Sequence, residues 1–193
     1  MSLLHRLSLV IPCLLALSPA LADTDPWYPY PVEVRPALLE QGLPYLLRMD
    51  YLPQPRAERP RKLCVSIPHL KDVYWLAVNH GLVTEARRLG VDLDVLVAGG
   101  YEHLERQIQQ IRDCVDDGGE AVIAAAIEAD GLNRLVVDLR TRGLPVVDLV
   151  NGMDSPLITA RIRVSFTDMA RAVGDHIVRL HPAGTESVAV AWF

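Results

Sequence analysis

The sequence predicts an α/β fold built on a parallel sheet. From Lys62 onward, short apolar segments alternate with segments in which apolar residues recur at helical spacing. Glycines follow each of the first three helical segments, as is typical of helix C-termini. Short connections of this kind form right-handed βαβ units, which place successive strands parallel in one sheet. We therefore expect a three-layer lobe with helices on both faces of the sheet.

The elements are expected in a regular order. The first strand, 62–68, is a short apolar run, and the second, 92–98, alternates in polarity. The third, 121–127, is apolar on both faces, as a central parallel strand is, and the fourth is 144–150. The three helices between them are predicted from apolar stripes: Val78, Leu82, Ala86 and Leu89; Leu104, Ile108, Ile111 and Val115; Leu132, Leu135, Val136 and Leu139. Beyond these, we expect 160–166 to be extended, 168–180 helical and 186–193 a strand.

Residues 1–22 have the pattern of a secretory signal peptide. Arg6 precedes an apolar run that is too short to span a bilayer as a helix, and Ala20 and Ala22 supply the small residues that cleavage requires. We expect cleavage after Ala22, export from the cytoplasm, and no membrane span in the mature chain. Export would place the two remaining cysteines, Cys64 and Cys114, in an oxidising compartment. That favours a disulfide between them, with two buried free thiols as the alternative.

Residues 23–61 form a proline-rich N-terminal arm. Eight prolines in this stretch disfavour regular helices and central strands. Five aromatic residues lie among them: Trp27, Tyr28, Tyr30, Tyr45 and Tyr51. We interpret the segment as an extended arm that lies on the domain through its aromatic rings, with a flexible tether as the alternative.

The composition and motifs exclude several classes of function. The net charge is −5 and no basic block is present, so a nucleic-acid partner is not expected. No Gly-x-Gly-x-x-Gly follows the first strand, and neither a P-loop nor a Gly-x-Ser-x-Gly elbow occurs. The histidines lack the spacing of zinc ligands. The sequence therefore predicts a protein without catalytic residues, cofactor or metal.

A candidate ligand site lies where the first two strands end, because ligands of parallel sheets bind beyond the carboxyl ends of the strands. Asp72 is suited to cap the first helix, and Tyr74 and Trp75 fall in its first turn, where only one of two adjacent rings can face the core. Tyr101 follows the second strand. One carboxylate with several rings suits a small cationic or strongly dipolar solute. The alternative is that the rings only close the end of the core.

Three segments, 62–79 (KLCVSIPHLKDVYWLAVN), 98–101 (AGGY) and 149–154 (LVNGMD), resemble the TorT-type periplasmic binding proteins of the trimethylamine N-oxide (TMAO) respiratory system. These proteins are similar to ribose-binding-type (type I) receptors. The resemblance implies two lobes that close on a ligand in the periplasm, without catalysis, and a partner in the periplasmic sensor domain of a TorS-type histidine kinase. It also implies that the cysteine pair matches that of the family.

The same resemblance implies which residues bind the ligand. On matching positions, Asp72, Tyr74, Trp75 and Tyr101 would contact it, and Asn151 belongs to the third matching segment. Phe166 stands in the crossing segment, where the family often has tryptophan, and is the candidate for a further ring. We therefore expect a TMAO-like ligand, a small polar or methylated amine. A solute receptor of an ABC transporter is the alternative, and gene neighbourhood would separate the two.

The domain organisation follows from these interpretations. Residues 62–160 are expected to form the first lobe of a type I periplasmic binding protein, and 161–193 the crossing segment and the beginning of a second lobe that is largely missing. The helix 168–180 and the last strand would then lack their packing partners. A chain of this length is expected to be prone to aggregation.

Overall fold

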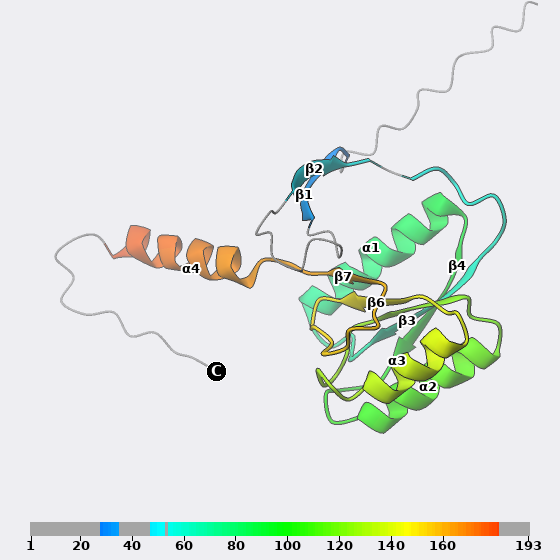
Figure 1. Ribbon diagram of the computed structural model, residues 1–193. Helices are drawn as coiled ribbons and strands as arrows, with labels where there is room; N and C mark the ends of the chain where they lie inside the picture. Colours follow the sequence, from blue (N-terminus) through cyan, green and yellow to red (C-terminus); the bar gives the residue numbers. More distant parts are fainter. Residues whose placement is uncertain (1–27, 35–46, 53, 182–193) are drawn as a thin grey trace, which may run out of the picture. The chain divides into compact units, whose positions relative to one another are not determined.

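The computed structural model describes residues 28–34, 47–52 and 54–181 (Figure 1). The chain divides into two compact units, Met1–Gln54 and Pro55–Phe193. The expected signal peptide and the expected strand at 186–193 lie outside the described residues. Within the described ranges, no helix is both long and apolar enough to cross a membrane.

The second unit is built on a five-stranded sheet with the order β4-β3-β5-β6-β7 (Figure 1). The strands are β3 (Lys62–Ile67), β4 (Asp92–Val97), β5 (Ala121–Ala124), β6 (Val146–Leu149) and β7 (Ala160–Ile162). All four neighbouring pairs are parallel. The predicted α/β fold with a parallel sheet is confirmed, and the carboxyl ends of all five strands therefore share one edge.

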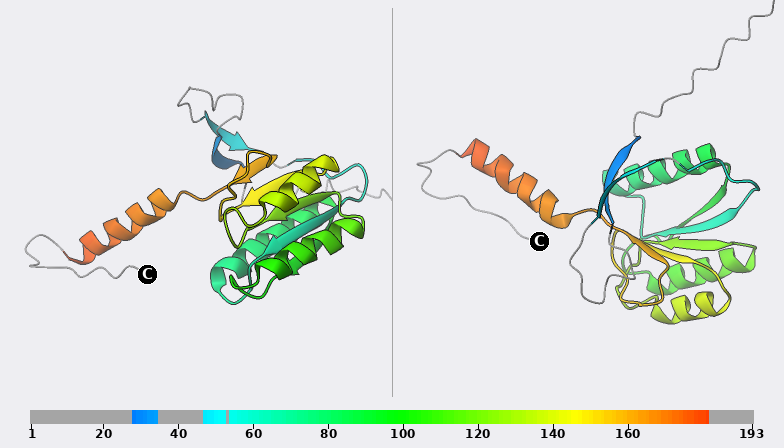
Figure 2. Two further views of the ribbon diagram at one scale, coloured as in Figure 1. Left: turned by 60° about the horizontal axis from the view of Figure 1, so that its bottom comes forward. Right: turned by 45° about the horizontal axis from the view of Figure 1, so that its top comes forward.

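Helices cover both faces of this sheet, as Figure 2 shows: α1 (Val73–Leu89) lies on one face, and α2 (Leu104–Asp116) and α3 (Asn133–Thr141) lie on the other. Successive residues of β3 point to opposite faces of the sheet and pack against different helix layers. Val65 packs in the cluster that contains Trp75 of α1, whereas Cys64 packs in the cluster that contains Ile111 of α2. This alternation follows from the two-residue period of a strand and gives the expected three layers.

The ends of α1 have the predicted caps. The side chain of Asp72 accepts a hydrogen bond from the backbone N–H of Trp75 at 2.9 Å. Gly90 follows the helix with φ of 68°, a left-handed conformation that glycine adopts without a steric penalty. Sequence signals at both ends therefore fix where this helix begins and where it ends.

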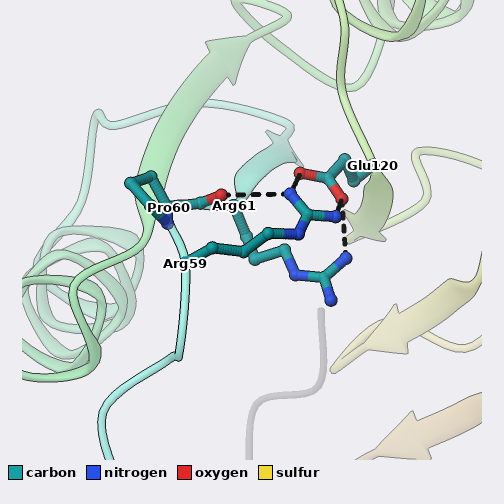
Figure 3. Close-up of polar contacts among 4 residues, drawn as sticks. All are labelled: Arg59, Pro60, Arg61 and Glu120. Carbon is teal, nitrogen blue, oxygen red and sulfur yellow. Dashed lines mark hydrogen bonds and ion pairs between the residues drawn. The ribbon is translucent and has the colours of Figure 1, made fainter.

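Residues 55–61, the last part of the proline-rich segment, belong to the second unit. The backbone N–H of Ala57 donates to Leu89 O at 2.8 Å. Arg59 and Arg61 both bind the carboxylate that precedes β5 (Figure 3): Arg59 makes two hydrogen bonds to Glu120, at 3.0 and 2.6 Å, and Arg61 one at 2.7 Å. The two guanidinium groups, Arg59 first, lower the pKa of Glu120 to about 2.

A disulfide joins the sheet to the α2 layer. Cys64 of β3 and Cys114 of α2 are bonded, with 6.1 Å between their Cα atoms. Both residues are buried in the same core cluster. The structure thus contains the disulfide that the two mature cysteines predict.

The first unit contains an antiparallel pair that the sequence analysis does not predict: β1 (Tyr30–Val34) and β2 (Leu47–Tyr51). Both strands of a two-stranded sheet are edge strands, so Pro31 is compatible with the pairing. The register places the apolar pairs Tyr30–Tyr51, Val32–Met49 and Val34–Leu47 on one face. The other face carries the ion pair between Glu33 and Arg48 at 3.0 Å.

The segment after the fourth predicted strand is only partly extended. β7 ends at Ile162, and Phe166, expected on an extended segment, is the first residue of α4 (Phe166–Leu180). The physical reason is a helix cap that the apolar pattern obscures: the side chain of Ser165 accepts from the N–H of Asp168 at 3.1 Å. No residue of α4 is buried.

Candidate ligand-binding site

The candidate site lies beyond the carboxyl ends of β3 and β4. Two backbone hydrogen bonds hold the segments that follow these strands together, from Ala98 N to Ile67 O at 3.1 Å and from Gly99 N to Pro68 O at 2.7 Å. This brings the beginning of α1 and the turn that carries Tyr101 to one place on the sheet edge.

Four aromatic rings form a cluster there. The ring centroids of Tyr74 and Trp75 are 5.4 Å apart, and those of His69 and Tyr101 are also 5.4 Å apart. His69 contacts Trp75 as well, at 6.4 Å, and all three pairs are close to perpendicular. Burial raises the pKa of the Tyr74 hydroxyl, and the neighbouring Tyr101 raises it further. The structure therefore brings together the three predicted rings and adds a fourth, that of His69.

The rings differ in their exposure. Trp75 is only 3% exposed and packs among core residues of the sheet, including Val65 and Leu149. Tyr74 is 37% exposed and Tyr101 48% exposed. Only one of the two adjacent rings in α1 faces the core, as expected, and it is Trp75. Tyr74 and Tyr101 are the rings most available to a solute.

Asp72 supplies the carboxylate of the cluster. Its Oδ1 atom accepts the capping hydrogen bond from Trp75 N, and its Oδ2 atom lies 3.8 Å from Nδ1 of His69. Its side chain is half exposed. The same residue therefore begins α1 and places negative charge beside the rings.

Charged groups of both signs surround the cluster. The pKa of Glu102 is lowered, first by a hydrogen bond from its own backbone and then by His103, Lys71 and His69. Among the described residues, no group of three or more His, Cys, Asp or Glu side chains is placed to hold a metal ion. Aromatic rings, hydrogen-bonding groups and charged side chains are available to a ligand at this edge.

Two predicted site residues are not joined to the rings. Asn151 follows β6 and donates from Nδ2 to Ala126 O at 2.9 Å, which ties it to the segment after β5. Its backbone N–H donates to Leu149 O at 2.8 Å around Val150, which has φ of 67°, a rare conformation for a β-branched residue. Phe166 is 59% exposed at the beginning of α4. No contact links either side chain to the ring cluster within the described part of the chain.

The side chain of Gln107 connects the ends of two strands near the site, and the sequence pattern does not predict this role. Gln107 of α2 is fully buried, and its Nε2 donates to Ser66 Oγ at 3.1 Å and to Ala125 O at 2.9 Å. Its Oε1 accepts from Ile127 N at 3.0 Å. The available signal is its position three residues after Leu104, on the apolar stripe of the helix.

The sequence pattern also does not predict the ion pair between Asp148, on β6, and Arg161. Asp148 is fully buried, and its Oδ2 accepts from Arg161 Nε at 2.6 Å and from Met153 N at 2.9 Å. Arg161, on β7, also donates to Met153 O. Among the described residues, the Oδ1 atom of Asp148 has no hydrogen-bond partner. One arginine thus joins the last two strands and the turn between them.

A comparison with protein families decides the relationship. Residues 63–191 match the family described as periplasmic binding protein domain. The chain belongs to the periplasmic binding protein family. This periplasmic binding protein is 39% identical over 124 residues to periplasmic protein TorT of Escherichia coli K12, and 40% identical over 126 residues to TorT of Escherichia coli O157:H7. Each alignment covers 64% of this chain and 35% of the relative, so the chain spans about a third of the length of these curated relatives. The resemblance to TorT-type proteins is confirmed.

Solved structures agree with this assignment. An ABC transporter solute-binding protein from Bradyrhizobium sp. BTAi1, with bound bis-tris, is 45% identical with a TM-score of 0.72, covering 84% of this periplasmic binding protein and 48% of the solved chain. That share of the chain exceeds the second unit, so the similarity extends into the first. The complex of TorT with the TorS sensor domain, in the absence of ligand, is 34% identical with a TM-score of 0.59 over 66% of this chain and 45% of that chain. The same complex in the presence of TMAO matches at 35% identity and a TM-score of 0.58, over 65% and 44%.

Proposed function

We propose that this chain is the first lobe of an exported periplasmic sensor that binds a small methylated or polar amine, similar to TMAO. In this proposal the protein is not an enzyme, and it signals its ligand to the sensor domain of a TorS-type histidine kinase. The observation that carries the proposal is the cluster of Asp72 with Tyr74, Trp75 and Tyr101 beyond the carboxyl ends of β3 and β4.

The chemistry of this cluster suits a methylated amine. Aromatic faces attract methylated ammonium groups, worth roughly 0.5–2 kcal/mol per ring, depending on desolvation. The half-exposed carboxylate of Asp72 balances positive charge on the nitrogen. The exposed rings of Tyr74 and Tyr101 offer the contact surface, while Trp75 supports them from the core. Asn151 and Phe166 would complete the site when a second lobe closes over this edge.

The similar proteins support the same chemical class. TorT has been solved in complex with the TorS sensor domain in the presence of TMAO, and the Bradyrhizobium protein holds bis-tris. TMAO and bis-tris are both nitrogen compounds with three carbon substituents on the nitrogen. These two compounds support a ligand whose nitrogen carries three carbon substituents.

A solute receptor of an ABC transporter is the second candidate function. The 45% identity to the Bradyrhizobium solute-binding protein, over 84% of this chain, favours it. The two functions make different predictions about the protein partner. A receptor for a histidine kinase would bind the purified periplasmic sensor domain of a kinase encoded nearby, whereas a transport receptor would stimulate a permease.

Calorimetric titration of the full-length gene product with TMAO and with bis-tris tests the ligand site. We expect Tyr101→Ala to weaken binding of the amine about 2- to 30-fold, the equivalent of one lost ring contact. Asp72→Asn retains a residue that caps helices, so the fold should survive while the affinity for a cationic amine falls. Val137→Ala is the matched control, since this apolar side chain is as exposed as Tyr101 but lies on α3, away from the ring cluster.

The result that opposes the proposal is equally specific. If neither amine binds the wild-type protein, the ligand class is wrong. If Tyr101→Ala and Val137→Ala both bind the amine as the wild type does, the ring cluster is not the site.

A further inference from the structure

His69 is the aromatic member of the cluster that the resemblance does not assign to the ligand, and its hydrogen bonds define where its proton lies. The backbone N–H of Lys71 donates to Nδ1 of His69 at 3.3 Å. An imidazole nitrogen that accepts a hydrogen bond carries no proton, so the neutral ring has its proton on Nε2. Asp72 Oδ2 is 3.8 Å from the same Nδ1, too far for a hydrogen bond that would reverse this assignment.

The ring is held in place by its neighbours. It makes T-shaped contacts with the rings of both Trp75 and Tyr101. Its side chain is 13% exposed, so it is largely enclosed but still reaches the surface. Within the described residues, nothing accepts a hydrogen bond from Nε2. The Nε2–H group of His69, which has no acceptor in the described part of the chain, therefore lies beside rings that suit methyl groups.

We propose that His69 donates its Nε2–H to the negatively charged oxygen of an amine N-oxide, while the rings and Asp72 hold the methylated nitrogen. This inference rests on the proposed function and narrows its ligand class. An N-oxide carries a positive nitrogen bonded to a negative oxygen, so it needs a hydrogen-bond donor close to the rings. A quaternary ammonium ion of the same size has a methyl group in place of that oxygen and gains nothing from the donor.

The test compares TMAO with tetramethylammonium by calorimetry on the full-length gene product. The two probes have nearly the same shape and differ in the oxygen that would accept the bond. His69→Phe keeps an aromatic ring but removes the donor. It should weaken TMAO binding on the order of tenfold to a hundredfold, the usual effect of losing a hydrogen bond to a charged group, and leave tetramethylammonium binding unchanged.

Two further variants keep the inference falsifiable. His69→Gln retains an amide donor and should recover part of the TMAO affinity, even if the phenylalanine variant proves less stable. His80→Phe is the matched control, because this exposed histidine lies in the middle of α1 and is not part of the cluster. It should bind both probes as the wild type does. Melting temperatures of all variants would be followed in parallel.

The remaining outcomes distinguish a failure of the His69 donor role from a failure of the proposed ligand class. If the wild type binds TMAO and His69→Phe binds it equally well, the donor role of His69 is wrong and the proposed function stands. If His69→Phe weakens both probes to the same extent, His69 acts through packing alone and the inference is again wrong. If the wild type binds neither probe, the proposed ligand class fails, and this inference fails with it.

Discussion

Replacing Arg161 with methionine tests the buried ion pair that joins β6 to β7. The substitution keeps most of the apolar length of the side chain and removes its charge and its donors. Asp148, fully buried, would then lose the 2.6 Å bond to Arg161 and keep only the one from Met153 N. Its Oδ1 atom has no partner in the described part of the chain, so a buried carboxylate would remain there with a single hydrogen bond.

The size of the expected loss in unfolding free energy follows from the burial of Asp148. Removing one partner of a buried ion pair costs about 3–5 kcal/mol, because the other charge stays buried and uncompensated. The side chain of Arg161 is 33% exposed, so water would compensate part of this loss. We expect Arg161→Met to lower the free energy of unfolding by about 2–4 kcal/mol. In a domain of 150–250 residues this corresponds to a melting temperature roughly 5–15 °C lower.

Urea and thermal unfolding of the full-length gene product would measure the effect. Arg163→Met is the matched control, because this exposed arginine makes no ion pair or hydrogen bond within the described residues. The double variant with Asp148→Leu and Arg161→Met should be more stable than Arg161→Met alone, since no charge is then left buried. Equal stability of Arg161→Met and the wild type would refute the reasoning.

Three further predictions concern other parts of the lobe. Glu120 has a pKa lowered from 4.5 to about 2, so the stability that it contributes is present above pH 4.5 and is lost as the pH falls towards 2. Urea unfolding across this range should show a shrinking difference in the free energy of unfolding between the wild type and Glu120→Gln. The Cys64–Cys114 disulfide closes a loop with a sequence separation of 50 and should contribute about 4 kcal/mol, so non-reducing mass spectrometry of the exported protein should find no free thiol, and reduction should lower the urea midpoint. Trp75→Ala should lower the free energy of unfolding by about 3–5 kcal/mol, whereas Tyr101→Ala, at an exposed ring, should change it far less.

The outcomes that contradict these predictions are direct. A difference between wild type and Glu120→Gln that stays constant across the pH range, or that high salt leaves unchanged, would show that Arg59 and Arg61 do not stabilise the ionised carboxylate. Two free thiols in the exported protein would exclude the disulfide. Normal stability of Trp75→Ala would place that ring outside the core.

Local signals in the sequence account for most of the predicted fold. Asp72 and Gly90 are residues that begin and end helices, and both do so at α1. The alternation of strands and helices predicts the parallel sheet because βαβ units have one favoured geometry. The prolines near the hairpin argue against strands, so the sequence does not predict it; the two strands form because Tyr30–Val34 pairs with Leu47–Tyr51.

The parts that the sequence does not predict depend on distant partners. Gln107 occupies an apolar stripe, yet its three hydrogen bonds go to groups on and beyond β3 and β5. Arg161 finds Asp148 only because β6 and β7 pair in a register that sets these two residues opposite each other. At the site, Tyr74 and Trp75 are adjacent in sequence, and only packing decides that Trp75 is the buried one.

The disulfide also restricts a residue that carries no sulfur. A Cβ atom at Gly119 would collide with the Sγ atom of Cys64 and would lie 3.0 Å from the backbone oxygen of Cys114. The bridge therefore occupies the volume that any side chain at position 119 would need. The order of substitutions in this lobe is therefore constrained: loss of the bridge makes a larger residue at position 119 less costly, whereas a larger residue introduced first would collide with the Sγ atom of Cys64.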